Sequence, residues 1–248
     1  MKDSSYIGSK WKKTVVIEKE PRLAPFIPDT VRMNELSLRS MLDQYGMVYV
    51  KPVHGTYGNG VMRAERRRYG YAYQLGEKMS EHDSLKSLYA SILKDTGGKK
   101  YLVQRGIHLL LHKGRKFDLR VMAQLSPQGQ WETTGVIGRV AAEGKIVTNY
   151  HSGGELVPAE RLLEPYTDQV REKLAQLAEL GVITGQTLQR RFPDVYKIGL
   201  DIAMESNLKP WILEVNTRPD PYIFRKHPNP KVFRKIRKYE RAYTSKKL

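Results

Sequence analysis

Residues 211–219 read WILEVNTRP, an apolar run that ends in charged and polar side chains. The run is typical of a buried strand, in which successive side chains point to opposite faces of the sheet. Ile212, Glu214 and Asn216 are therefore predicted to share one face. An acid and an amide on one rigid face are oxygen ligands of the kind that Mg2+ prefers. Polar residues are also ordinary where a strand reaches solvent, so this stretch alone leaves both interpretations open.

A second apolar run, 197–203, precedes this stretch and contains an aspartate. If the runs 197–203 and 211–216 pair around a two-residue loop, Asp201 lies directly opposite Glu214. Two opposed carboxylates destabilise a sheet unless a cation, an arginine or a proton compensates them. With Asn216 they form a predicted divalent-ion site. A longer loop would let the two carboxylates diverge, and the sequence leaves that alternative open.

The composition indicates a globular protein that attracts polyanions. The 248 residues are 40% hydrophobic, and 43 Lys and Arg against 26 Asp and Glu give a formal net charge of +17. Such a charge favours nucleotides, nucleic acid or anionic polymers as partners, without choosing among them. The absence of cysteine excludes disulfides and thiol chemistry. Without an apolar leader or a membrane-length apolar run, we expect a cytoplasmic protein with no membrane insertion.

Apolar periodicity and turn residues predict mixed helices and strands along the chain. Within 61–75, a hairpin is predicted with Tyr69, Tyr71 and Tyr73 on one face, and within 167–192 two helices are predicted that break at Gly181. The other predicted helices are 35–44 and 84–93, and the predicted strands are 47–52, 101–104, 117–125, 131–140, 196–205 and 210–216.

The C-terminal segment 225–248 carries ten Lys or Arg against one Glu. Its apolar residues recur at helical spacing, which predicts a basic amphipathic helix. These apolar residues are Val232, Phe233, Ile236 and Tyr239.

The stretch 48–61, VYVKPVHGTYGNGV, places a lysine at the end of an apolar strand and glycines directly after it. Backbone amides near Gly55, Gly58 and Gly60 could approach phosphate oxygens closely, with Lys51 as a point charge. The lysine precedes the glycines, so this is not a P-loop, and no helix follows to make a dinucleotide fingerprint. A glycine-rich hairpin connection is the alternative interpretation.

Two arginines lie inside apolar strands, Arg120 in FDLRVM and Arg139 in VIGRV. A buried guanidinium is costly without an anionic partner, which here is either an internal carboxylate or a bound phosphate. No serine elbow or other nucleophile signature is present.

The order of the motifs along the chain resembles that of the ATP-grasp superfamily of carboxylate-amine ligases. A lysine and a glycine-rich loop come first, then two strands that contain arginines, then an aspartate and a Glu-x-Asn motif. More closely, the chain is similar to the endospore coat-associated YheC/YheD-type ATP-grasp proteins of bacilli. The similarity extends from about Ser9 to Pro221. The motifs that carry it are SKWKK, APFIPDT, VYVKPVHGTYGNGV, YLVQRGI, KFDLRVMAQ, GRVAAEGKIVTNYHSGGE and WILEVNTRPDP.

The resemblance implies an α+β fold of the ATP-grasp type, with two subdomains that grip ATP between them. The expected N-terminal subdomain is 1–104, the C-terminal subdomain is 105–225, and 226–248 is a basic helix or tail. Because the first motif lysine is almost at the start, we expect the chain to lack the N-terminal domain that usually precedes this core.

The resemblance also assigns roles to individual residues. The strand YLVQRGI would be the hinge that holds adenine through its backbone. The residues assigned to ATP are Lys10, Lys51, Gly55, Gly58, Gly60, Gln104 and Ile107. The residues assigned to magnesium are Asp201, Glu214 and Asn216. The residues assigned to charge neutralisation at the transferring phosphoryl group are Arg120, Arg139 and Arg218.

The implied function is an ATP- and Mg2+-dependent, spore-associated ligase that joins a carboxylate to an amine or thiol through an acyl phosphate. Its expected partners are ATP, a carboxylate and an amine substrate, with an anionic peptide or envelope polymer as a candidate. A non-catalytic spore coat or structural protein on the same scaffold is the alternative. Nucleic-acid binding would depend on the basic tail alone.

Overall fold

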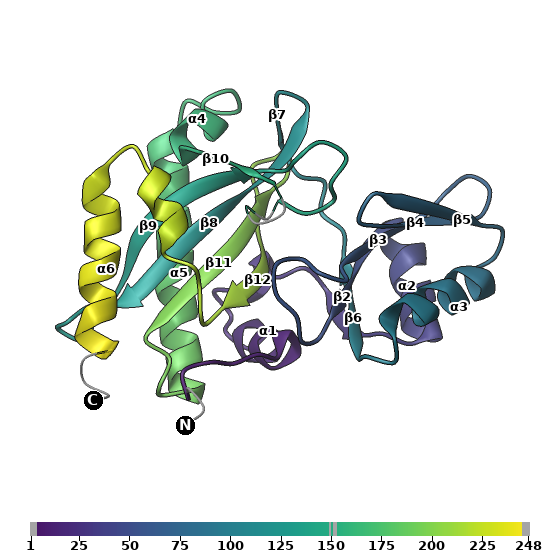
Figure 1. The fold of residues 1–248 in the computed structure, drawn as a ribbon, viewed down its shortest axis with the longest axis horizontal. Coiled ribbons are helices and arrows are strands. Elements are labelled where there is room, and N and C mark those ends of the chain that lie inside the picture. Colours follow the sequence, from purple (N-terminus) through teal and green to yellow (C-terminus); the bar gives the residue numbers. More distant parts are fainter. Residues whose placement is uncertain (1–3, 149, 151–152, 245–248) are drawn as a thin grey trace.

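A computed structural model describes residues 4–148, 150 and 153–244 of the chain. Two β-sheets lie beside each other, and each carries its own helices and its own hydrophobic core (Figure 1). The first sheet has the strand order β1-β6-β2-β3-β4-β5, and the second has the order β10-β9-β8-β11-β12 with β7 paired to β8. Asn149, His151 and Ser152 of the motif GRVAAEGKIVTNYHSGGE, and residues 245–248 of the tail, lie outside the described residues.

The first sheet is covered on one face by two helices, α2 (Glu35–Tyr45) and α3 (Leu85–Thr96). Both predicted helices are confirmed, and side chains of Asn34 and Ser84 accept hydrogen bonds at their first turns, as N-caps do. The strands are β1 (Thr30–Arg32), β2 (Met47–Pro52), β3 (Met62–Arg66), β4 (Tyr71–Leu75), β5 (Lys78–His82) and β6 (Tyr101–Arg105).

The prediction of three tyrosines on one face of a hairpin is wrong in part. Tyr73 is buried in the core of the first sheet, but Tyr69 lies in the turn between β3 and β4 and is 82% exposed. The added strand β5, which follows β4, was not predicted because its polar sequence KMSEH has no apolar alternation.

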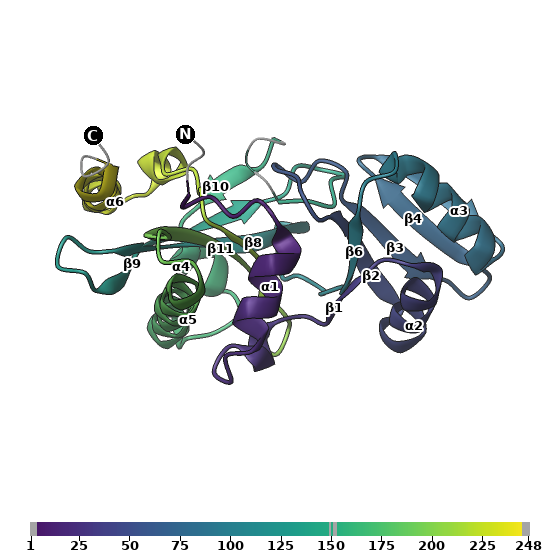
Figure 2. The ribbon, with the colours of Figure 1, turned by 90° about the horizontal axis from the view of Figure 1, so that it is seen from below.

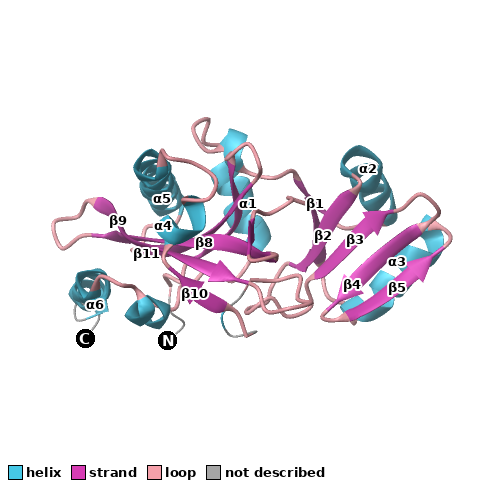
Figure 3. Ribbon diagram, turned by 90° about the horizontal axis from the view of Figure 1, so that it is seen from above, coloured by secondary structure: helices cyan, strands magenta, loops and turns pink. Residues whose placement is uncertain are grey.

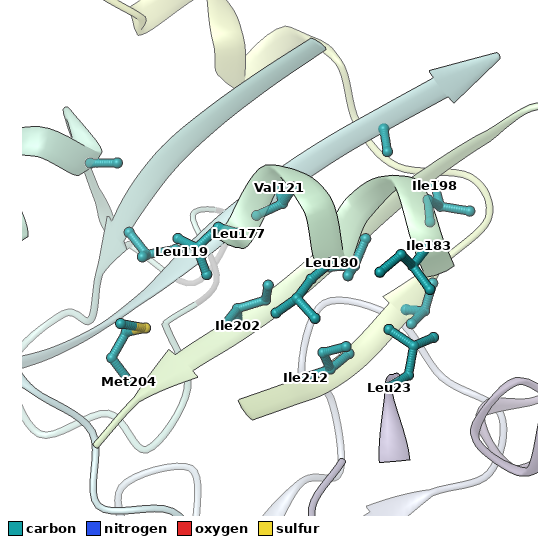
Figure 4. Packing of buried hydrophobic residues seen from close by; sticks show 14 of the residues in the cluster. Leu23, Leu119, Val121, Leu177, Leu180, Ile183, Ile198, Ile202, Met204 and Ile212 are labelled. Atoms are coloured by element: carbon teal, nitrogen blue, oxygen red, sulfur yellow. The ribbon is translucent and has the colours of Figure 1, made fainter. Parts of the chain in front are cut away.

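The second sheet is covered on both faces (Figures 2 and 3). One face packs against α1 (Lys10–Glu18), α4 (Ala159–Leu163) and α5 (Val170–Arg191). Figure 4 shows the side chains of α5 packed on those of the strands. The strands are β7 (Leu111–His112), β8 (Arg115–Leu125), β9 (Trp131–Val140), β10 (Glu155–Val157), β11 (Lys197–Met204) and β12 (Pro210–Asn216).

The opposite face of the second sheet is covered at one end only. There the short helix η3 (Tyr222–Lys226) and the C-terminal helix α6 (Pro230–Thr244) place Phe224 and Ile236 against Met122 of β8. The predicted basic amphipathic helix is thus confirmed, and it is packed on the sheet. The remaining part of this face carries polar side chains.

The prediction of two helices within 167–192 is wrong, because α5 is a single helix of 22 residues. Glycine at positions 181 and 185 serves close packing of this helix on the sheet. A Cβ atom at Gly181 would lie 2.5 Å from Thr133 Oγ1, and one at Gly185 would lie 2.2 Å from the Trp131 ring. The two glycines lower the intrinsic helix propensity of α5, but they allow the helix to pack closely on β9.

The register of β11 and β12 places Asp201 opposite Glu214, as predicted. The connection is longer than predicted, because Glu205 N–H bonds to the Lys209 carbonyl and residues 206–208 form the loop. A β-bulge at Leu213 adds one residue to β12 and restores the pairing.

The bulge also changes which side chains share a face. Ile212 packs in the core beneath α5 (Figure 4), whereas Leu213, Glu214 and Asn216 line a cavity on the other face. The prediction that Ile212 shares a face with Glu214 is therefore wrong, while that for Asn216 is right.

The subdomain boundaries 1–104, 105–225 and 226–248 stay predictions. The packing shows that the segment before the first sheet belongs to the other core: Ile17, Leu23 and Ile27 pack with the residues of the second sheet. No helix in the described part of the chain combines the length and apolar character needed to cross a membrane.

We predict that Gly185→Ala lowers the free energy of unfolding by about 1–3 kcal/mol, because the added methyl group collides with Trp131. The loss should occur although alanine favours helix by about 1 kcal/mol. Gln186→Ala, at the exposed neighbouring position, is the control. Urea unfolding measures both variants, and a Gly185→Ala protein as stable as the wild type would contradict the packing account.

Candidate functional site

A cavity of about 660 Å3 lies over the polar part of the second sheet. Strands β8, β11 and β12 form its floor, β2 and the loop 53–61 face them, and residues of the segment 141–150 lie at the same opening. Its far end is lined by η3 and α6. The cavity therefore joins the two sheets and the C-terminal helix.

A row of charged side chains crosses the floor of this cavity. Register places Arg139 of β9 opposite Asp118 of β8, Arg120 of β8 opposite Asp201 of β11, and Asp201 opposite Glu214 of β12. Arg139 donates to both carboxylate oxygens of Asp118, at 2.8 and 2.5 Å. The pair is almost fully buried, with 4% and 3% of the side chains exposed.

Asp201 is the meeting point of the two arginines. Its Oδ1 accepts from Arg120 Nε at 2.7 Å and lies 3.1 Å from an Arg139 nitrogen. Gly199 makes room for this arrangement, because a Cβ there would lie 3.3 Å from Arg120 Cδ and 2.8 Å from Pro219 Cβ. A side chain at Gly199 would collide with Pro219 and would crowd Arg120.

The arginines keep Asp201 ionised. Burial alone would raise the pKa of Asp201, but the guanidiniums of Arg120 and Arg139 outweigh it and lower the pKa to about 2. Burial opposes the charge of Arg139, yet Asp118 and Asp201 raise its pKa above the usual range. Asp201 and Arg139 are thus both charged at neutral pH.

Lysines surround the second carboxylate. Lys10 Nζ donates to Glu214 Oε1 at 2.6 Å and to the Gly55 carbonyl at 3.0 Å. Its own backbone N–H bonds to the Val53 carbonyl at 2.9 Å, which ties the first turn of α1 to the glycine loop. Lys10 therefore connects Glu214 of the candidate metal site with the glycine loop, which is the candidate phosphate-binding loop.

Lys51 enters from β2 and reaches Gln104 Oε1 at 2.5 Å, with no carboxylate partner among the described residues. Removal from water lowers the pKa of Lys51 to about 8, against the opposing pull of Glu214. Lys13, which sequence reasoning missed, lies nearby, bonds to the Ile7 carbonyl at 2.9 Å and also has its pKa lowered by burial to about 8. Its spacing of three from Lys10 on one helix was the available signal.

The glycine loop 53–61 lines the cavity with several of its residues, Gly58 among them. Gly58 and Gly60 have φ values of +75° and +72°, which side chains rarely tolerate. A Cβ at Gly58 would touch Val147 at 3.2 Å, and one at Gly60 would lie 2.7 Å from Tyr101 Oη. The loop and the segment around Val147 thus meet closely at the mouth of the cavity.

The predicted hinge forms the apolar end of the cavity. Gln104 turns its side chain away to Lys51 and to Thr30 Oγ1, whereas Ile107 lines the cavity with Leu213. The amides of residues 105 and 106 are already bonded to backbone carbonyls, and the amide of Ile107 has no partner in the described chain. Backbone at Ile107 is therefore available to a ligand.

The metal candidates fit a hard cation that also binds phosphate. Asp201 Oδ2 and Glu214 Oε2 have no partner within the described residues, and the Asn216 amide lies on the same face. Among those residues no three His, Cys, Asp or Glu side chains converge as a metal cluster. Such a donor set suits Mg2+, which typically takes one or two carboxylates and completes its shell with water and phosphate oxygens.

The three predicted arginines differ in their surroundings. Arg120 and Arg139 are buried and committed to carboxylates of the chain. Arg218 also lines the cavity but is exposed, and no ion pair of its side chain occurs within the part of the chain that is described. Arg218 is thus the predicted arginine that is available to an external anion.

Sequence reasoning missed Asp118 and the residues at the far end of the cavity. There, Lys197 Nζ lies 2.5 Å from Glu240 Oε1, and Arg237 pairs closely with the same carboxylate. Lys197 begins β11, while Arg237 and Glu240 come from α6. Only the packing of α6 on the sheet brings these three together.

We predict that Asp118→Asn lowers the free energy of unfolding by about 3–5 kcal/mol, because it leaves the buried Arg139 guanidinium without its principal partner. Asp43→Asn removes an exposed ion pair with Arg66 and should cost less than about 1 kcal/mol. Urea denaturation of both variants checks this. Equal costs for the two substitutions would show that the buried pair does not stabilise the sheet.

The fold agrees with two solved structures. A D-cycloserine synthetase, DcsG, matches with a TM-score of 0.57 at 11% identity, over 95% of this chain and 70% of the other. The C-terminal domain of the K. lactis ATP-grasp enzyme Pby1 matches with a TM-score of 0.50 at 14% identity, over 94% and 71% of the two chains. Both show the fold alone.

Sequence relatives are more specific. The endospore coat-associated protein YheD of Bacillus subtilis (strain 168) is 28% identical over 230 residues, which are 89% of this chain and 50% of YheD. The endospore coat-associated protein YheC of the same strain is 22% identical over 220 residues, 86% of this chain and 60% of YheC. This chain therefore spans half to three fifths of their lengths. The family described as YheC/D-like ATP-grasp matches residues 3–246, and the chain belongs to that family.

Proposed function

We propose that the chain is an ATP- and Mg2+-dependent ligase that joins a carboxylate to an amine or a thiol through an acyl phosphate. The observation that carries the proposal is the surplus of cations at the cavity. Lys10, Lys13 and Lys51 gather beside Glu214, and Lys51 has no carboxylate partner in the described chain. Lys13 is buried and Lys51 is half-buried, so these cations are costly without an anion, which a polyphosphate supplies.

In this proposal ATP lies along the cavity with adenine at the apolar end beside Ile107 and Leu213. Lys51 and the amides of the glycine loop bind phosphate oxygens, and Lys10 moves from Glu214 to phosphate or bridges the two. The glycine loop and the segment around Val147 meet at the mouth of the cavity, and their closure over bound ATP would exclude water. Gln104 contributes indirectly, because it holds the Lys51 ammonium group.

Asp201, Glu214 and Asn216 would hold magnesium, which when bound supplies charge neutralisation at the β- and γ-phosphates. Arg120 and Arg139 keep Asp201 ionised and in place, which revises the role the resemblance assigned to them. Arg218, exposed at the cavity, is the arginine that would contact the transferring phosphoryl group.

The chemistry then needs no nucleophile from the protein. A carboxylate oxygen of the substrate attacks the γ-phosphorus, the bond to ADP breaks, and an acyl phosphate forms. The amine or thiol attacks the acyl carbon, loses its proton, and phosphate leaves. The protein orients the reactants, supplies fixed positive charge and excludes water, which fits a chain without cysteine.

A non-catalytic spore coat protein on the same scaffold remains the second candidate, since the relatives YheD and YheC are named as endospore coat-associated. The residues assigned to ATP and magnesium line the cavity or the small pocket beside it, or belong to the adjoining glycine loop, which favours the enzyme. Spore association and a cytoplasmic location of this chain are also proposals.

We predict that Glu214→Gln weakens ATP binding in the presence of Mg2+ by at least about tenfold, because it removes one ligand charge from the metal candidate. Glu214 is 22% exposed, so the loss of its ion pair with Lys10 should cost less stability than Asp118→Asn, whose pair is almost fully buried. Isothermal titration calorimetry with and without Mg2+ measures the affinity. Glu132→Gln, which removes an ion pair with Lys235 outside the cavity lining, is the matched control.

The two candidate functions separate in this experiment. Binding that requires Mg2+ and Glu214 supports the ligase and justifies testing carboxylate and amine pairs for ADP release. A wild-type protein that binds no ATP would favour the scaffold. Identical affinities for wild type and Glu214→Gln would refute the metal assignment.

We also predict that ATP binding takes up protons near pH 8. Lys51 has a pKa of about 8 in the free protein, so roughly half of it is uncharged there, and a bound phosphate raises that pKa. The sign is therefore uptake, and it should grow between pH 7 and about pH 8. Calorimetry in buffers of different ionisation enthalpy measures it.

The control is Lys51→Arg, which keeps a cation that does not titrate in this range. This variant should bind with a smaller uptake than the wild type. Uptake that is absent in the wild type, or unchanged in Lys51→Arg, would show that Lys51 does not contact the phosphates.

A further inference from the structure

The C-terminal helix α6 presents three distinct faces. Its apolar face, including the buried Ile236, packs on the second sheet. A second face contributes Arg237, Glu240 and Thr244 to the far end of the cavity. The third face points to solvent, so one helix borders both the cavity and the outer surface.

The solvent face carries exposed cations at positions i, i+3 and i+7, which lie on one side of a helix. We call Lys231, Arg234 and Lys238 the basic stripe; all three side chains are exposed, and none has an ion pair among the described residues. The only acid in 225–248 is Glu240. Its carboxylate is committed to Lys197 and Arg237 at the cavity, so it does not neutralise the stripe.

Basic side chains also line the cavity beside α6. Lys197 and Arg237 lie at the far end, and Arg218 follows toward Asp201 and Glu214. The carboxylate of Glu240 is held there by a lysine and an arginine, so the basic groups at this end are arranged around a carboxylate. A polypeptide with many carboxylates would match both the basic stripe on the surface and the basic side chains inside the cavity.

We infer that α6 is a docking surface for an acidic polypeptide, which is the substrate whose carboxylate reaches the cavity. The inference rests on the proposed function, because that reaction requires a carboxylate. A polycarboxylate provides the reacting group and the anchoring charges in one molecule, whereas a nucleic acid offers phosphates and no carboxylate.

The exposed tyrosine of η3, which lines the cavity beside α6, also disfavours a nucleic acid. Single-stranded nucleic acids use open aromatic rings as stacking platforms. The exposed Tyr222 of η3 already carries Arg225 at 4.8 Å and Arg237 at 5.3 Å from its ring centre. The stripe itself contains no aromatic residue.

The experiment measures binding of a fluorescent oligoglutamate peptide by anisotropy, without nucleotide. The test variant combines Lys231→Gln, Arg234→Gln and Lys238→Gln. The control combines Lys86→Gln, Lys94→Gln and Lys99→Gln, which removes the same number of exposed cations from the first subdomain. We expect roughly tenfold weaker binding for the test variant and little change for the control.

Loss of affinity in the test variant alone supports the docking surface. Wild-type affinity in the test variant, equal losses in both variants, or no peptide binding by the wild type would overturn it. An RNA oligonucleotide that binds the stripe more tightly than the peptide would assign the surface to nucleic acid and also overturn it.

Titration with ATP tests the proposed function independently of the docking surface. The test variant should bind ATP as the wild type does, because the basic stripe does not line the cavity. Peptide binding through the stripe by a wild type that binds no ATP would leave the docking surface standing and remove its role as a substrate site.

Discussion

The structure depends on how two carboxylates, Asp201 and Glu214, are held opposite each other on neighbouring strands. Their repulsion is offset on one side by Arg120 and Arg139 and on the other by Lys10. Because Lys10 begins the first helix, the same network fastens the N-terminal segment to the second sheet. The same set of ion pairs therefore shapes the candidate site and stabilises the second sheet.

Small backbone features create this geometry. The loop 206–208 is one residue longer than the simplest hairpin, and without compensation Glu214 would slip by one position and point to the core. The bulge at Leu213 corrects the register, and Gly199 leaves space for the Arg120 side chain. Neither feature adds a charged group, yet both decide where the charges lie.

The sequence predicted the elements whose signals are local. Apolar spacing identified α2 and α3. The pairing of Asp201 with Glu214 was predicted from a two-residue loop, and it is found because the bulge at Leu213 offsets the extra residue of the actual loop. The single helix α5 was missed, because a glycine that allows close packing looks the same in sequence as one that breaks a helix. Asp118, Lys13 and the α6 residues at the cavity were missed because their partners are distant in the chain, and only tertiary packing brings them together.

A crystal structure with a non-hydrolysable ATP analogue and Mg2+ tests the central claim most directly. The account predicts phosphates bound by Lys51 and the glycine loop, adenine beside Ile107, and the metal bound by Asp201, Glu214 and Asn216. A nucleotide bound elsewhere, or a cavity whose Lys10–Glu214 pair is unchanged at saturating nucleotide with no metal beside Asp201, would contradict it.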